Sequence, residues 1–261
     1  MRVIAVTGSA SGIGAATLAR LEAAGNRVIG IDLRDAEVIA DLADPSGAAG
    51  PGGRSGAIAA VRQLAGDHLD GLVVCAGVGP HVEPWSTIAS LNYFGAQTLL
   101  AGLRELLATA PRAAAVAVTS NSTTLPGVDS PLVAACLAGE EEEARSIAVT
   151  LDGHRAYAGS KLALARWVRR NAPTAEWAGA GIRLNAVAAG AVRTPLLQGG
   201  LDHPVFGDAI RGFPIPLGGF GAPDDIAAAI AFLLGPDASF CCGSIFFVDG
   251  GTDALFRPDV Y

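Results

Sequence analysis

The chain has 261 residues, of which 51% are hydrophobic and 16% are charged, a composition that is typical of a folded globular protein and excludes a disordered chain. The formal net charge of −7 argues against a nucleic-acid partner, because phosphate binding requires basic surfaces. No apolar run reaches the roughly 18 residues that a membrane span needs, and we see no secretion signal, so we expect a cytoplasmic protein without a membrane partner.

A strand, a glycine turn and a helix are predicted at the start of the chain. Residues 2–6 form a buried apolar run, and residues 15–25 predict a helix that ends in a glycine. The turn between them contains Gly8, Gly12 and Gly14. Backbone N–H groups at such a turn bind anions, and the missing Cβ atoms let a pyrophosphate approach closely. We therefore expect a dinucleotide here, with a purely structural turn as the alternative.

Apolar runs then alternate with helical patterns. We expect strands at 26–32, 37–41, 71–77, 113–120, 182–187 and 245–248, and helices at 57–65, 86–110, 153–171 and 224–234. Residues 44–56 are rich in Gly, Pro and Ser and predict a loop. This alternation predicts a single doubly wound α/β domain of the Rossmann type over residues 1–261, with about seven parallel strands and helices on both faces.

Asp32 ends the second expected strand. A carboxylate at this point can accept hydrogen bonds from the adenosine ribose hydroxyls and would repel a 2′-phosphate. This favours NAD over NADP, while the nearby Arg34 leaves the use of NADP open. A solvent-exposed loop acid is the alternative interpretation.

Tyr157 and Lys161 are four residues apart and therefore share one face of the expected helix. A phenol has a pKa of about 10, which must fall by roughly 3 units for proton exchange near neutrality. A neighbouring ammonium and a positively charged nicotinamide ring both act in that direction. We expect a proton-transfer pair, although this spacing is also common on amphipathic surface helices.

These features, together with Cys75-Ala76-Gly77, Asn92, Ser120 and Gly190-x₃-Thr194-Pro195, resemble the short-chain dehydrogenase/reductase family over essentially the whole chain. Residues 31–42, 92–95 and 249–254 are similar to the bacterial 3α-hydroxysteroid dehydrogenase/carbonyl reductase group within it. Members that act on coniferyl-type alcohols are similar too. The resemblance implies an oxidoreductase that transfers a hydride between NAD(H) and a hydrophobic alcohol or ketone.

The resemblance also implies a role for each matching position. Tyr157 would be the general acid/base, and Ser120 would orient the substrate oxygen, with Ser122 as the alternative. Lys161 would hold the nicotinamide ribose and lower the Tyr157 pKa, and Asn92 would keep a water that links Lys161 to solvent. Asp41 and Leu42 would meet the adenine, and Val192 and Thr194 the carboxamide; the other implied cofactor contacts are Gly8, Ser11, Gly12, Ile13, Gly14, Asp32, Leu33, Cys75, Ala76, Gly77, Tyr157, Lys161 and Gly190.

The sequence departs from the family pattern in three ways. Cys75 stands where Asn is usual, which removes a hydrogen bond that braces the sheet. Ala189 replaces the usual Pro before Gly190, which leaves that loop less constrained. Ser120 and Tyr157 are 37 residues apart, beyond the usual family spacing, so we expect an insert at about 123–155.

The insert contains two helical patterns, at 131–137 and 140–149, and the four glutamates at 140–143 predict a solvated face. Helices corresponding to 86–110 and 153–171 commonly form a four-helix dimer interface in this family. We expect the insert to cover or alter that interface, which favours a homodimer over the common homotetramer.

Residues 195–217 form the expected substrate lid, with an ordinary buried loop as the alternative. Their apolar content suits a bulky steroid or aromatic substrate. The apolar residues are Leu196, Leu197, Val205, Phe206, Ile210, Phe213 and Ile215.

The four cysteines and four histidines show no metal-ligand spacing, so we expect no metal site and no zinc-dependent dehydrogenase. Two other functions remain open. One is a coniferyl-type aromatic alcohol dehydrogenase of the same fold. The other is a non-catalytic NAD-sensing regulator, which would be expected to lack the tyrosine or the lysine of the pair.

Overall fold

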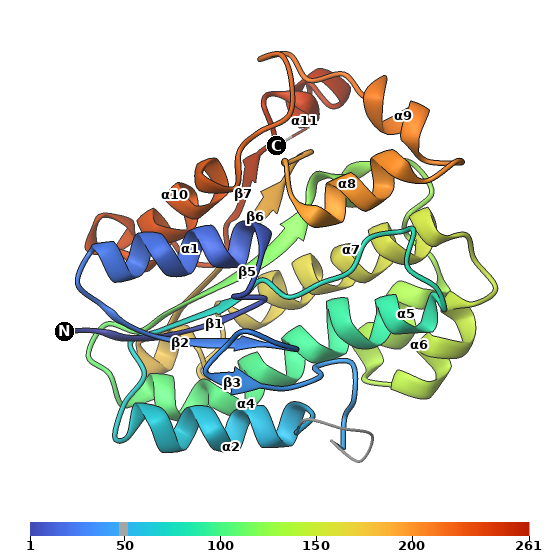
Figure 1. The fold of residues 1–261 in the computed structure, drawn as a ribbon. Coiled ribbons are helices and arrows are strands. Elements are labelled where there is room, and N and C mark those ends of the chain that lie inside the picture. The colour runs from blue at the N-terminus through green and yellow to red at the C-terminus, as the bar shows by residue number, and fades with distance from the viewer. Residues whose placement is uncertain (47–51, 261) are drawn as a thin grey trace.

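One sheet of seven parallel strands runs through residues 1–46 and 52–260, the part of the chain that this computed structural model describes (Figure 1). The strand order is β3–β2–β1–β4–β5–β6–β7. The strands are β1 (Val3–Thr7), β2 (Arg27–Asp32), β3 (Val38–Ile39), β4 (Gly71–Val74), β5 (Ala114–Ser120), β6 (Arg183–Ala189) and β7 (Ile245–Val248).

Helices cover both faces of the sheet (Figure 1). α1 (Gly12–Ala23) and α10 (Pro223–Leu234) lie on one face, and α2 (Arg54–Ala65), α4 (Ala96–Ala108) and α7 (Gly153–Asn171) on the other. The remaining helical segments are α3 (Ser86–Ala89), the π-helical η1 (Ser90–Gly95), η2 (Asn121–Thr124), α5 (Pro131–Ala138), α6 (Glu141–Ala148), η3 (Ala178–Ala180), α8 (Pro195–Asp202), α9 (Gly207–Arg211), η4 (Pro236–Ala238) and α11 (Thr252–Phe256).

The continuous apolar character of the strands follows from this double cover, because parallel strands bury both faces. In β1, Ile4 and Val6 pack toward α1 and α10, whereas Ala5 joins the opposite core with Leu99 of α4 and Leu164 of α7. The predicted fold class, a doubly wound parallel sheet, is confirmed.

The strand order reverses beside β1. β1 pairs with β2 on one side and with β4 on the other, so the chain moves outward in one direction from β1 to β3 and in the opposite direction from β4 to β7. Ligands of doubly wound sheets bind at the carboxyl edge near such a reversal. The glycine turn and the loop after β4 both lie at this edge.

Several predicted boundaries differ from the structure by a few residues, and two of these differences have a clear structural cause. The expected loop at 44–56 ends earlier, because α2 begins at Arg54, whose buried side chain is fixed by long-range contacts; residues 47–51 lie outside the described part. The expected helix at 86–110 is divided into α3, η1 and α4, because its middle adopts the wider π geometry around Asn92.

The insert forms α5 and α6, as its two helical patterns predicted. α5 packs against α7, where the side chain of Leu132 lies over Gly159, and α6 packs against α3 (Figure 1). Leu132, Ala144 and Ala148 are fully buried, so the insert is part of the core. No helix among the described residues combines the length and the apolarity that a membrane crossing requires.

Candidate active site

The turn after β1 requires glycine at three positions, Gly8, Gly12 and Gly14. Gly8 and Gly12 have φ of +69° and +53°, where L side chains are strained. A Cβ on Gly14 would lie 2.0 Å from the Gly8 carbonyl oxygen, and a Cβ on Gly8 would lie 2.9 Å from the Ala76 nitrogen. The turn is therefore a close-packed cradle at the N-terminus of α1, and the backbone N–H groups of the first turn of this helix suit the pyrophosphate of NAD.

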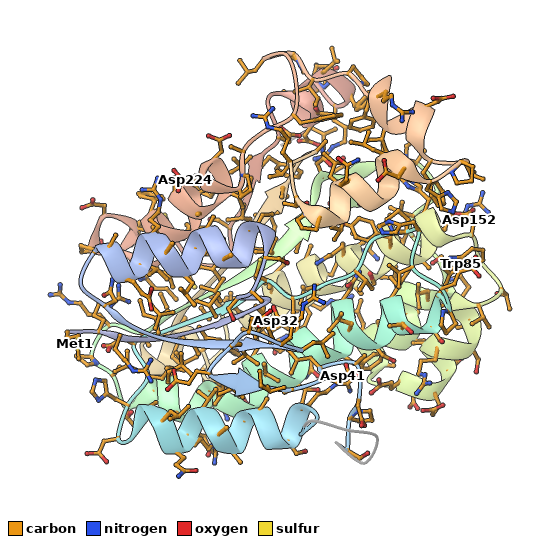
Figure 2. The ribbon with its side chains drawn as sticks, viewed as in Figure 1. Met1, Asp32, Asp41, Trp85, Asp152 and Asp224 are labelled. Atoms are coloured by element: carbon orange, nitrogen blue, oxygen red, sulfur yellow. The ribbon has the colours of Figure 1, made fainter. Side chains whose placement is uncertain are left out.

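Asp32 lies at the wall of the groove that starts from this cradle (Figure 2). Its carboxylate accepts hydrogen bonds from the backbone nitrogens of Ala10, at 3.0 Å, and Leu33, at 2.7 Å. These bonds fix the carboxylate at the end of β2. The position suits the adenosine ribose contact that the sequence predicted. Thirteen of the predicted cofactor residues line this part of the groove: Gly8, Ser11, Gly12, Ile13, Gly14, Asp32, Leu33, Asp41, Leu42, Cys75, Ala76, Gly77 and Thr194.

The brace between β1 and the loop after β4 comes from Thr7. Its Oγ1 accepts hydrogen bonds from the backbone nitrogens of Cys75 and Ala76, both at 2.9 Å. The substitution of Asn by Cys75 therefore leaves this junction hydrogen-bonded. Burial raises the pKa of the Cys75 thiol to about 12, which keeps the thiol neutral.

Ser120 and Tyr157 meet at the other end of the groove. Ser120 ends β5, where its Oγ accepts a hydrogen bond from the Ser122 nitrogen at 3.1 Å. Its hydroxyl also acts on Tyr157, lowering the pKa of the phenol. α7, which carries Tyr157, begins where the Asp152 carboxylate caps the Arg155 nitrogen at 2.8 Å. The Tyr157 contact favours Ser120 over Ser122, although both line the same pocket.

Lys161 lies one helical turn after Tyr157, and only 5% of its surface is exposed. Its Nζ donates a hydrogen bond to the Val118 carbonyl oxygen at 2.9 Å. Burial lowers the pKa of Lys161 to about 8, so the ammonium form still predominates near neutrality.

The protein itself raises the pKa of Tyr157. Burial is the largest cause, Cys75 adds to it, and the Ser120 hydroxyl acts in the opposite direction. Lys161 is not among these causes, so the lowering of this pKa by Lys161 stays a prediction for the protein with NAD bound. In the protein alone, desolvation of the phenolate is the dominant effect.

Asn92 is fully buried in η1 and holds the backbone beside the groove. Its Oδ1 accepts a hydrogen bond from the Val78 nitrogen at 2.9 Å, and its Nδ2 donates to the Val78 carbonyl at 3.0 Å. A Cβ on Gly77 would lie 3.0 Å from Asn92 Oδ1 and 3.4 Å from Lys161 Nζ. Asn92 and Lys161 therefore converge on the same glycine.

The loop after β6 forms one wall of the groove through Thr194, Pro195 and Leu196. Thr194 caps α8, accepting from the Leu197 nitrogen at 3.2 Å, and its methyl group lies over Gly12. Gly190 is locked in place, because a Cβ there would lie 2.6 Å from the Asp249 Cα. Val192 bridges to Gly221. The loop is therefore well fixed although Ala189 replaces proline.

A second pocket continues the groove beyond the nicotinamide end. The two hollows share Ile13, Cys75, Gly77, Thr194 and Leu196, so they form one continuous cleft. The second contains Ser120, Tyr157, Lys161, Gly190 and Val192 among the predicted site residues.

Five of the seven apolar residues of the expected lid line this cleft: Leu196, Leu197, Phe206, Ile210 and Phe213. The other two do not. Val205 is 72% exposed, and Ile215 lines a separate hollow beside Gly250. The lid is therefore built mainly from α8, α9 and the two phenylalanines that flank α9, Phe206 and Phe213.

Sequence reasoning missed several residues of the cleft. His154 lines the substrate side, and its position one turn before Tyr157 on the same helix was a usable signal. Leu91 and Ala40 line the adenosine end, and Leu125 lines the substrate pocket. Simple apolar residues in loops carry no distinguishing pattern, so only the fold brings them to the site.

The sequence matches the enoyl-(acyl carrier protein) reductase family over residues 148–253 and the NAD dependent epimerase/dehydratase family over residues 4–194. It is 45% identical, over 99% of both chains, to the 3-alpha-hydroxysteroid dehydrogenase/carbonyl reductase of Comamonas testosteroni. It is 31% identical to the D-threitol dehydrogenase of Mycolicibacterium smegmatis, over 96% of this chain and 92% of that protein.

The structure superimposes on the crystal structure of the 3-alpha-hydroxysteroid dehydrogenase of Pseudomonas sp. B-0831 complexed with NADH. The TM-score is 0.94, the sequence identity is 50%, and the match covers 99% of this chain and 100% of the other. The chain therefore belongs to the short-chain dehydrogenase/reductase family of NAD-dependent oxidoreductases.

Proposed function

We propose that the chain interconverts a hydrophobic secondary alcohol and its ketone with NAD(H), and that a 3α-hydroxysteroid or a related carbonyl compound is the substrate. One observation carries the proposal: Tyr157 and Ser120 lie together where a cofactor groove opens into an apolar pocket. The similarity to two 3-alpha-hydroxysteroid dehydrogenases over nearly the full chain supports the same substrate class.

In this proposal, the Gly8–Gly14 turn, Asp32 and Lys161 hold NAD, which supplies and accepts the hydride when bound. Ser120 donates a hydrogen bond to the substrate oxygen and orients it toward Tyr157. The Tyr157 hydroxyl gives its proton to that oxygen during reduction and takes it back during oxidation. Because burial raises the pKa of Tyr157, the phenol stays protonated at neutral pH, as proton donation requires.

The pocket supports a bulky apolar substrate. Leu197, Phe206, Ile210 and Phe213 face a site whose polar groups are concentrated around Ser120, Tyr157 and the residues after β5. Such a pocket binds an apolar body and fixes one oxygen by hydrogen bonds.

We also propose a cytoplasmic homodimer. All four cysteines are free, which is typical of a reducing compartment. α5 covers the outer side of α7, where a four-helix interface would otherwise form. The insert therefore favours two subunits over four.

The test is a panel of carbonyl compounds. Their reduction is followed by the loss of NADH absorbance as NADH is oxidised. We expect turnover of 3-ketosteroids with NADH and a weaker response with NADPH, because the Asp32 carboxylate repels a 2′-phosphate. Turnover of coniferyl-type aldehydes with no turnover of ketosteroids would replace the proposed substrate class. NADH binding without turnover of any carbonyl compound would instead support a non-catalytic sensor.

A further inference from the structure

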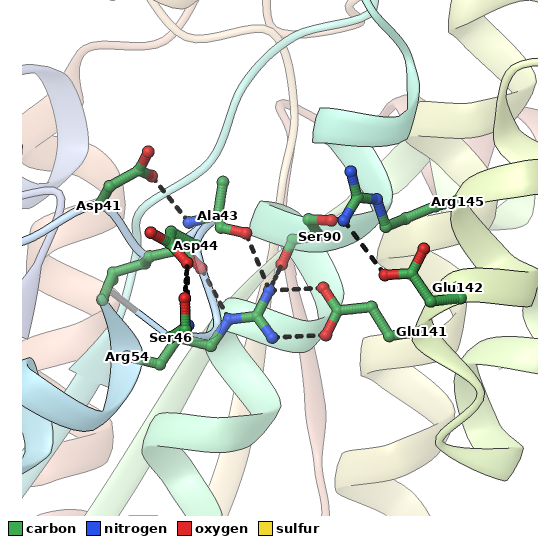
Figure 3. Close-up of polar contacts among 10 residues, drawn as sticks. Asp41, Ala43, Asp44, Ser46, Arg54, Ser90, Glu141, Glu142 and Arg145 are labelled. Atoms are coloured by element: carbon green, nitrogen blue, oxygen red, sulfur yellow. Dashed lines mark hydrogen bonds and ion pairs between the residues drawn. The ribbon is translucent and has the colours of Figure 1, made fainter. Parts of the chain in front are cut away.

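A buried arginine lies behind the adenosine end of the groove. Arg54 begins α2, and only 3% of its surface is exposed. Its guanidinium donates to three backbone carbonyls and to both oxygens of one carboxylate (Figure 3). The acceptors are Leu42 O at 2.9 Å, Ala43 O at 3.3 Å, Ser90 O at 2.9 Å, and Glu141 Oε2 and Oε1 at 2.6 and 2.7 Å.

The carbonyls belong to two segments of the chain that contribute walls to the groove. Leu42 and Leu91 both line the adenosine end, and Arg54 bonds the carbonyl of Leu42 and that of Ser90, which precedes Leu91. Gly95 sets the close approach of the two walls, because a Cβ there would lie 2.8 Å from the Leu42 carbonyl oxygen. One guanidinium therefore ties the loop after β3 to η1.

The counter-charge of Arg54 comes from the insert. Glu141 is the first residue of α6, and its side chain is 18% exposed. Figure 3 shows both of its carboxylate oxygens facing the guanidinium. A buried cation is costly unless a carboxylate pairs with it in good geometry, and this pair is bidentate. The insert thus supplies the group that keeps Arg54 in place.

We propose that Glu141 is a positioning residue for the cofactor: through Arg54 it fixes the distance between the two walls that enclose the adenosine half of NAD. The inference rests on the proposed assignment of Asp41 and Leu42 to the adenine. It gives the insert a function in cofactor affinity in addition to its effect on the α7 surface.

Loss of the Glu141 carboxylate leaves the Arg54 cation buried and unpaired. The guanidinium then gains free energy by turning toward water, which releases the Leu42 and Ser90 carbonyls. The two walls separate, and the adenosine half of the cofactor binds more weakly. The nicotinamide half is unaffected, because Tyr157 and Lys161 lie at the other end of the cleft.

The experiment compares Glu141→Ala and Glu141→Gln with Glu142→Ala as a matched control. Glu142 lies in the same turn of α6, but its ion pair with Arg145 is exposed to solvent and contributes little. The readouts are the inhibition constants of AMP and of nicotinamide mononucleotide against NAD, the KM for NAD, kcat and Tm. AMP reports on the adenosine half alone.

We expect Glu141→Ala to raise the AMP inhibition constant and the NAD KM by about fivefold or more, which corresponds to about 1 kcal/mol. The nicotinamide mononucleotide constant and kcat should stay within about twofold. Glu141→Gln keeps the size of the side chain and part of its hydrogen bonding, so it should weaken AMP binding less than Glu141→Ala. If Glu141→Ala does not fold, the same constants measured on Glu141→Gln test the inference. Glu142→Ala should bind AMP as well as the unaltered protein or better, because a negative charge is removed.

An unchanged AMP constant together with a lower Tm in both Glu141 variants overturns the inference, because the ion pair then only stabilises the fold. Equal loss of AMP affinity in Glu142→Ala overturns it too. Failure of AMP to compete with NAD in the unaltered protein overturns the adenine assignment and, with it, the inference.

Discussion

At the scale of single residues, the proposed proton chemistry depends on the environment of Tyr157. The phenol is enclosed with Ser120 on the substrate side of the cleft, and burial raises its pKa. The neighbouring Lys161 is itself buried, and burial lowers its pKa to about 8. Its positive charge is therefore retained near neutrality and is lost as the pH rises above about 8. The protein therefore favours the neutral phenol, which is the proton donor for ketone reduction.

This environment predicts opposite pH profiles for the two directions. Oxidation needs the phenolate, whose fraction grows about tenfold per pH unit below the pKa. The rate of alcohol oxidation should therefore rise from about pH 6 to about pH 9, while ketone reduction stays level near neutrality and declines at high pH. Initial rates at saturating substrate in both directions measure this. An oxidation rate that does not change across that range would mean that the tyrosine is already ionised, contrary to the raised pKa.

At the scale of elements, the sequence predicted the helices whose ends are fixed by interactions within a few residues. α7 was located from its periodicity and its start, because Asp152 caps the helix without help from distant residues. The start of α2 was missed, because Arg54 is fixed by Glu141, 87 positions later in the chain. The direction of the Tyr157 pKa shift could not be predicted from the sequence either, because the burial of this side chain depends on the assembled cleft. Contacts between distant segments leave no periodic signal.

The glycine turn carries a prediction of its own. Gly14→Ala places a Cβ 2.0 Å from the Gly8 carbonyl oxygen, so the turn must open or α1 must shift. We expect a lower Tm and an NADH affinity weaker by at least about tenfold, or about 1.4 kcal/mol. Gly56→Ala in α2 is the control, because a Cβ there meets no atom within 4 Å and alanine favours a helix. Equal NADH affinity in Gly14→Ala and the unaltered protein would refute the close-packed cradle.

At the scale of the whole molecule, one cleft joins cofactor and substrate along the carboxyl edge of the sheet, and the insert is packed against the side of α7. The alternation of strands and helices was enough to predict this architecture, and the long spacing between Ser120 and Tyr157 was enough to predict the insert. The sequence did not reveal that the insert also pairs with the buried Arg54 through Glu141, because a run of four glutamates is typical of a solvated helix face.

The position of the insert predicts the size of the assembly. In the proposed dimer, α5, which packs against α7, blocks the four-helix contact that would complete a tetramer. Light scattering in dilute buffer should give twice the 26.2 kDa mass of one chain. A mass of four chains would show that the insert leaves the interface available.

The most direct test of the account is turnover by Tyr157→Phe at saturating NADH and ketosteroid. Removal of the hydroxyl oxygen should lower kcat by about a hundredfold to ten-thousandfold, because the variant lacks the proposed proton donor. NADH affinity, measured by fluorescence titration, should stay within about twofold, since the groove that holds the cofactor is unchanged. Undiminished turnover by this variant would contradict the assignment of Tyr157 as the general acid/base.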